Sequence, residues 1–220
     1  MKVGTKSVLF GAHCFFLHPW FVAAAWWQLY GFPFDPRLWV AFFVHDLGYW
    51  GKPNMDGEEG ESHPFLGAKI LGWLFDGVDL PEPDWNASWH GRTIGRVLNR
   101  LFGVHPGGNP PDRGGRLTWY CFSFYHSRFL AKRYGTCPSR LCVADKLAVA
   151  LTPWWLYLPM VNWTGEIHEY LKLADRGKYD TMQITTGDQR RWFREMTAYL
   201  RRWVAQFKDN LTDTWTPEGK

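Results

Sequence analysis

Two histidines and two aspartates of this 220-residue chain have side chains of the kind that holds a divalent transition metal: His18, His45, Asp46 and Asp145. The adjacent His45 and Asp46 follow an apolar run, residues 38–44, and burying both is costly unless a partner satisfies them. A metal ion is such a partner. Imidazole with carboxylate suits manganese, cobalt, nickel, iron or zinc better than calcium. We therefore expect these residues to converge on one divalent ion, with a second ion as the alternative.

Three helical segments must bring these residues together. His18 opens an apolar segment, and residues 37–46 form a second helix that ends in the histidine–aspartate pair. Neighbouring residues reach one ion only near a helix end, where the backbone is less constrained, and Gly48 provides that end. Asp145 comes much later, in the sequence Ala-Asp-Lys-Leu of a further helix. The order is thus a histidine, a histidine–aspartate pair and a final aspartate.

This order resembles the pattern of the HD-domain superfamily of metal-dependent phosphohydrolases over roughly residues 10–150. The resemblance rests on the apolar run with its histidine–aspartate pair and on the Ala-Asp-Lys-Leu element. It implies an all-α, HD-like helical bundle around a metal centre. The signatures of guanosine-tetraphosphate hydrolases, of cyclic-dinucleotide phosphodiesterases and of large deoxynucleotide triphosphohydrolases are missing, so the substrate branch stays open.

Two further histidines are candidates for catalysis. His63 begins a helix 17 residues after Asp46 and is similar to the additional histidine of many HD-domain proteins. His126 precedes Asp145 by 19 residues. Both could bind a second metal, or act near a single ion as a general acid or as a hydrogen-bond donor to phosphate. We expect no role for the remaining histidines, which are His13, His90, His105 and His168.

Four cations are candidates for binding phosphate oxygens. Arg128 and Lys132 lie four residues apart on one helix, Lys146 follows the last ligand candidate, and Lys52 lies in the loop after the histidine–aspartate pair. We expect Arg128 and Lys146 to take part in catalysis, and Lys52, Arg128 and Lys132 to bind substrate. Ordinary surface charge is an equally good interpretation of Lys132.

The predicted function is that of a metal-dependent phosphohydrolase, in which metal-activated water attacks the phosphorus of a small phosphorylated metabolite. A nucleotide or deoxynucleotide is the favoured substrate. One alternative is a binuclear iron oxygenase, because the HD scaffold also supports that chemistry. Another is a noncatalytic protein that keeps the metal for its stability and binds a partner through its aromatic or basic surface.

Apolar periodicity predicts an all-α fold, with no strand pattern of useful length. We expect a single domain over residues 1–220, with the HD-like core at about 10–150 and a C-terminal helical extension at about 160–210. The Gly- and Pro-rich residues 103–115 favour a connector over a lid. The expected helices are 8–30, broken near Pro19, and 37–49, 64–75, 89–102, 116–134, 139–158, 164–175 and 188–208.

Composition limits the partners. The 15 tryptophans favour a core of large rings over platforms for a base or a lipid, and a net charge of +4 suits an anionic substrate without implying nucleic-acid binding. The uncharged residues 8–30 could span a bilayer, but the mean hydropathy of the whole chain, −0.32, favours a buried helix for this segment. Four cysteines without metal-ligand spacing predict reduced thiols in the cytoplasm. The basic, amphipathic residues 188–210 leave contact with a membrane surface open but not favoured, and the oligomeric state stays open.

Overall fold

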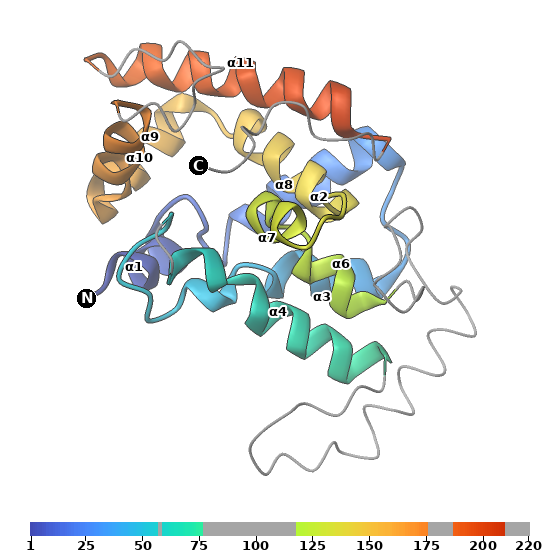
Figure 1. Cartoon of the computed structure of the whole chain (residues 1–220). Coiled ribbons are helices and arrows are strands. Elements are labelled where there is room, and N and C mark those ends of the chain that lie inside the picture. The colour runs from blue at the N-terminus through green and yellow to red at the C-terminus, as the bar shows by residue number, and fades with distance from the viewer. Residues whose placement is uncertain (57–58, 77–117, 176–186, 210–220) are drawn as a thin grey trace.

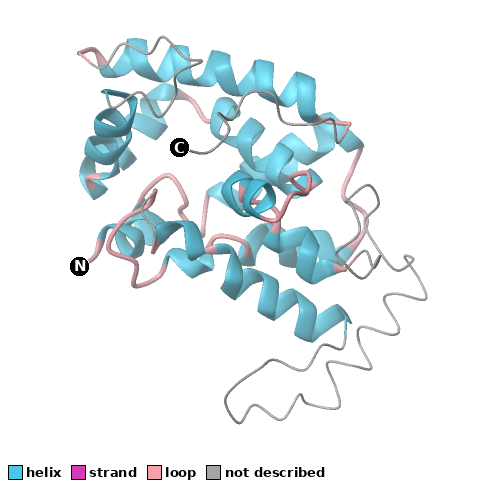
Figure 2. Cartoon of the chain, viewed as in Figure 1, coloured by secondary structure: helices cyan, strands magenta, loops and turns pink. Residues whose placement is uncertain are grey.

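The fold is all-α, as predicted, in the residues that the computed structural model describes: 1–56, 59–76, 118–175 and 187–209 (Figures 1 and 2). These residues contain helices and no strand. The α-helices are α1 Val3–Phe10, α2 His18–Tyr30, α3 Pro36–Val44, α4 Pro64–Leu71, α6 Trp119–Phe124, α7 Arg128–Arg133, α8 Arg140–Leu151, α9 Trp154–Thr164, α10 Glu166–Asp175 and α11 Gln189–Phe207. Short 3-10 turns span Leu47–Tyr49 and Gly60–Ser62, and a π-helical turn, Gly72–Asp76, extends α4.

Several predicted helices are divided in the structure. The expected helix 8–30 is two helices, because α1 ends at Phe10 and Pro19 lies in the first turn of α2, so that the break precedes it. Pro153 separates α8 from α9, and the two helices meet at a bend of 102°. The expected helix 116–134 divides into α6 and α7 around His126. The predicted helix 89–102 and the connector 103–115 lie outside the described residues.

Side-chain caps fix where the site helices start. The Asp35 carboxylate accepts the backbone N–H of Arg37 at the start of α3, and Pro36 occupies the first turn, where a missing N–H costs nothing. The Ser127 and Ser139 hydroxyls accept backbone N–H groups at the starts of α7 and α8. These caps set the register of the helices that hold the site residues.

The main hydrophobic core surrounds α8, which packs against α2 on one side and α11 on the other (Figure 1). Ala144 and Ala148 are fully buried, and these small side chains permit the close approach of neighbouring helices. Trp26 of α2 and Trp203 of α11 belong to the same core. Helix α8 is therefore held on both sides, which fixes Asp145 in its middle.

A second core joins α9, α10 and α11 and includes Tyr157, Ile167 and Trp192. Among the described residues, no single helix has the length and apolar composition to cross a bilayer. The bent pair of α8 and α9 reaches that composition together.

Candidate metal centre

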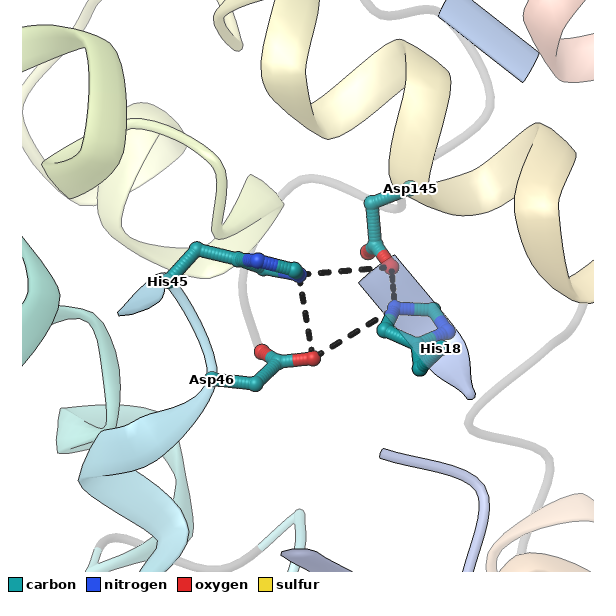
Figure 3. A group of neighbouring side chains, drawn as sticks. All are labelled: His18, His45, Asp46 and Asp145. Atoms are coloured by element: carbon teal, nitrogen blue, oxygen red, sulfur yellow. Dashed lines mark hydrogen bonds and ion pairs between the residues drawn. The ribbon is translucent and has the colours of Figure 1, made fainter. Parts of the chain in front are cut away.

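Four buried side chains from three segments point toward one another (Figure 3). His18 opens α2, His45 and Asp46 follow the last turn of α3, and Asp145 lies in α8. His18 Nε2 is 2.9 Å from Asp145 Oδ1 and 3.5 Å from Asp46 Oδ2. His45 Nε2 is 3.1 Å from Asp46 Oδ2 and 3.9 Å from Asp145 Oδ1. One donor atom from each residue lies within 4.8 Å of the others, so the set could hold a metal ion.

The hydrogen bonds of His45 fit a metal ligand. Its Nδ1 lies 2.9 Å from the carbonyl oxygen of Phe42, which can only accept, so Nδ1 carries a proton. Nε2 therefore presents a lone pair when the ring is neutral. Within the described chain, neither His45 Nε2 nor Asp46 Oδ2 has a hydrogen-bond partner, although both are buried. Two electron-pair donors that face each other are costly to bury while the ring is neutral, and either a proton or a metal ion between them removes the cost.

Asp46 also belongs to a second set of possible ligands, with His63 and His126. Its Oδ1 lies 3.6 Å from His63 Nε2 and 3.3 Å from His126 Nε2. His63 immediately precedes α4, and His126 lies in the turn between α6 and α7. The two oxygens of Asp46 thus face different ligand sets.

The Nε2 atoms of the two histidines in the second set face each other. The Nδ1 of His63 lies 2.8 Å from the carbonyl of Gly60, and that of His126 lies 2.5 Å from the carbonyl of Ser123. Both Nδ1 atoms therefore donate, and the two Nε2 atoms lie 3.0 Å apart. Two neutral rings in this arrangement would oppose their lone pairs, so a proton or a metal ion is needed between them.

The electrostatics keep both carboxylates ionised. Burial raises the pKa of Asp46, but His45 and His13 outweigh burial and hold the pKa well below its ordinary value. Burial also raises the pKa of Asp145, and Lys146, whose Nζ lies 2.7 Å from Asp145 Oδ2, helps to bring it well below its ordinary value. The charged form, which binds metal, is thus the stable form of both groups.

The imidazoles divide into two kinds. Burial lowers the pKa of His18, His63 and His126, so that these rings favour the neutral, metal-binding form. Burial also lowers the pKa of His45, but the two carboxylates together raise it to about 10. Without metal, His45 therefore holds a proton where an ion would otherwise lie.

One ring stack and two close backbone contacts hold the second set against the first. The His63 ring stacks on Tyr49, with ring centroids 3.9 Å apart and planes 13° apart. A side chain at Gly48 would collide with the backbone of His63, and one at Gly67 would meet the backbone of Val44 and His45. Glycine is required at both crossings because two main chains touch there.

His13, for which we expected no role, lies beside the site. Its Nδ1 is 2.9 Å from Ser7 Oγ and 3.8 Å from Glu166 Oε2, and its ring contacts those of His18 and Tyr49. Glu166 is fully buried and accepts hydrogen bonds from backbone and hydroxyl groups. No sequence signal connects these two residues, since they are 153 positions apart (166 minus 13).

A cavity of about 150 Å³ adjoins the ligand sets. Lys146, which contacts Asp145, and Tyr49, which stacks on His63, both line it. The remaining wall is largely aromatic and apolar: Ala12, His13, Met55, Asp56, Arg128, Val149, Tyr157, Tyr170, Trp192, Met196, Tyr199 and Leu200. Tyr49 and the residues from α9, α10 and α11 were not among the sequence-based candidates.

The predicted cations do not gather at one place. Arg128 lines the cavity, donates to the Tyr199 hydroxyl at 3.2 Å and lies over the Trp203 ring. Lys52 does not line the cavity and donates to Ser62 Oγ at 2.6 Å. Lys132 is exposed on α7 and does not line the cavity either. The substrate-binding roles of Lys52 and Lys132 stay predictions.

Comparison with known proteins adds no relative: no protein-family model matches the chain, and no curated protein or solved structure is significantly similar to it. The fold and the site therefore carry the functional argument. They consist of a helical framework with a buried histidine–aspartate cluster that could bind metal, which is compatible with an HD-type fold.

Proposed function

We propose that this protein is an HD-type, metal-dependent phosphohydrolase that acts on a small phosphorylated metabolite, with a nucleotide or deoxynucleotide as the favoured substrate. One observation carries the proposal. The Nε2 atom of His45 and the Oδ2 atom of Asp46 face each other, 3.1 Å apart, inside a buried four-residue ligand set, and this set adjoins a cavity with Lys146 and Arg128 in its wall. The four free cysteines fit a cytoplasmic enzyme.

The ligand set would be His18, His45, Asp46 and Asp145, with manganese, cobalt, nickel, iron or zinc as the ion. When bound, such an ion acidifies water and neutralises charge that develops on a phosphate. Lys146 is held beside the site by Asp145, and Arg128 is held by the rings of α11. In our proposal both cations bind nonbridging phosphate oxygens, and the tyrosine and methionine side chains hold the organic part of the substrate.

The role of His63 and His126 depends on how many ions bind. With one ion, the two rings would serve in general acid–base catalysis through their facing Nε2 atoms. With two ions, both rings would be ligands, and Asp46 would belong to both ligand sets. The facing lone pairs make the second position more favourable than sequence alone implied, where one ion was preferred.

Metal analysis combined with a phosphate-release screen tests the proposal. We expect the purified protein to contain transition metal, to release phosphate, pyrophosphate or triphosphate from a nucleotide, and to lose this activity in EDTA. Manganese, cobalt or nickel should restore it. His45→Ala should remove metal and activity, whereas His168→Ala, a change at an exposed histidine, should change neither. Metal binding that depends on His45, without hydrolysis of any phosphoester, would overturn the hydrolase and leave an oxygenase or a noncatalytic metal protein.

A binuclear iron oxygenase is the second candidate, because His63 and His126, which face the shared Asp46, extend the ligand set to six residues. It predicts two iron equivalents and dioxygen consumption with an organic substrate. Measuring oxygen uptake and the near-infrared spectrum of the iron-loaded protein separates it from the hydrolase.

A further inference from the structure

The outer face of α9 is unusual for a helix that packs on a protein core. Residues 154–164 contain no charged side chain, and the inner face is buried against α10 and α11. The outer face is nevertheless exposed: Trp155 is 62% exposed and Trp163 is 72% exposed. A helix that is apolar on all sides is normally either buried in a core or in contact with lipid. The exposed side of α9 is therefore a candidate binding surface for a partner that packs against tryptophan side chains.

Neighbouring elements extend this face. Phe10 of α1 contacts Trp163, with ring centroids 4.9 Å apart. At the other end of α9, the guanidinium of Arg190 lies 3.9 Å from the ring centre of the half-exposed Trp154. Asn162 and Gln189 exchange hydrogen bonds, which fixes α9 against the start of α11. We refer to these exposed side chains, with those of Trp155 and Arg194, together as the α9 surface, which comprises Phe10, Trp154, Trp155, Trp163, Arg190 and Arg194.

The charge of the α9 surface is positive. Arg190 and Arg194 lie one turn apart on the exposed face of α11, and Arg191 beside them is paired with Glu195. A second copy of this chain is a poor occupant, because a two-fold interface would set these arginines against their own equivalents. An anionic bilayer matches both features, since tryptophan favours the headgroup level and arginine pairs with lipid phosphate.

We propose that the α9 surface binds peripherally to membranes that contain anionic lipid, with the tryptophans in the headgroup region and the arginines on lipid phosphates. The inner side of the same two helices supplies Tyr157, Trp192 and Met196 to the cavity wall. Membrane contact would thus lie directly behind the cavity. The proposal does not depend on the reaction that the metal centre performs.

Vesicle flotation of the full-length protein tests this proposal. The wild type should float with vesicles of equal parts phosphatidylcholine and phosphatidylglycerol and bind pure phosphatidylcholine weakly, with binding that falls as salt is raised. The variant Trp155→Ser/Trp163→Ser should lose at least about tenfold in partitioning. The variant Arg190→Gln/Arg194→Gln should bind the anionic vesicles about fivefold more weakly for each arginine removed, and its binding to pure phosphatidylcholine should not change.

The control is Trp27→Ser/Phe34→Ser, which removes two equally exposed aromatic side chains from α2 and from the turn before α3. It should float like the wild type, and circular dichroism should show that all variants are folded. Quenching of tryptophan emission by brominated lipid reports contact in the wild type without any substitution. Four outcomes would each overturn the proposal. The wild type does not bind vesicles, or the control loses as much vesicle binding as Trp155→Ser/Trp163→Ser. Alternatively, the wild type is a dimer that dissociates in Trp155→Ser/Trp163→Ser, or it binds nucleic acid instead of vesicles.

Discussion

The two ligand sets that meet at Asp46 differ in charge. The first joins two ionised carboxylates to two histidines and is approached by Lys146. The second has two neutral imidazoles and one oxygen of the shared Asp46. Attraction for a cation is therefore stronger in the first set, where two full negative charges face it. If two ions bind, we therefore expect the first set to fill before the second as metal is added.

Asp46→Asn should have the largest effect, because this carboxylate serves both sets. We expect the loss of nearly all bound metal and a fall in activity of more than about a hundredfold. Plasma emission spectrometry and the turnover rate on one preparation measure both. Asp188→Asn is the matched control, since this exposed aspartate caps α11 and asparagine caps equally well. Near-normal metal content in Asp46→Asn would show that the sets do not share this residue.

Asp145→Asn and His126→Gln should separate the two sets. Asp145→Asn removes a charge from the first set alone, so metal affinity and activity should both collapse. If two ions bind, His126→Gln should lower bound metal from about two equivalents to about one. If one ion binds, His126→Gln should leave the metal in place and lower turnover by about 10² to 10⁴-fold. Equal metal loss in both variants would contradict the order of filling.

The pH dependence of metal binding sharpens the same contrast. In metal-free protein the pKa of His45 is raised to about 10, so its protonated form stabilises the fold fully below its ordinary value of 6.5. This contribution is lost as pH rises toward 10, where an ion no longer competes with the proton. Added manganese should therefore raise the melting temperature more at about pH 9 than at about pH 6. Differential scanning fluorimetry with and without EDTA measures the effect, and a larger shift at the lower pH would contradict it.

Replacing Tyr49 should have the smallest effect. Tyr49→Phe keeps the ring that stacks on His63, and we expect nearly normal activity. Tyr49→Ala removes the stack, so the second set should loosen and turnover should fall by about tenfold, with the first ion retained. Metal titration and steady-state kinetics of both variants separate the ring from the hydroxyl. Equal losses in the two variants would assign the role to the hydroxyl that lines the cavity.

Local patterns explain what the sequence could predict. The histidine–aspartate pair closes a helix and the Ala-Asp-Lys-Leu element lies on another, and the resemblance of this order to the HD-domain pattern indicated the ligand set around His45 and Asp145. The all-α class followed from apolar periodicity. Helix ends were less accurate, because α1 stops where Gly11 must pack against the Glu166 carboxylate. That contact crosses most of the chain and leaves no local signal.

The cavity wall shows the same limit. Arg128 was predicted as a phosphate ligand from its place near His126, but its position depends on Tyr199 and Trp203 of α11. Apolar residues at helical spacing on α9 and α11 predicted only that these helices pack. Which of their side chains face the metal centre depends on the bend at Pro153, a tertiary property.

The glycine contacts at Gly48 and Gly67 bear on how such a centre can change over evolution. Because main chain touches main chain there, the spacing between the two ligand sets does not depend on which side chains extend from it. Exchange of a ligand for a carboxylate would leave these backbone contacts in place, and it would shift the preference toward harder cations. A side chain at Gly48 or Gly67 would disturb both ligand sets together, so these two glycines constrain the centre more than any single donor side chain does.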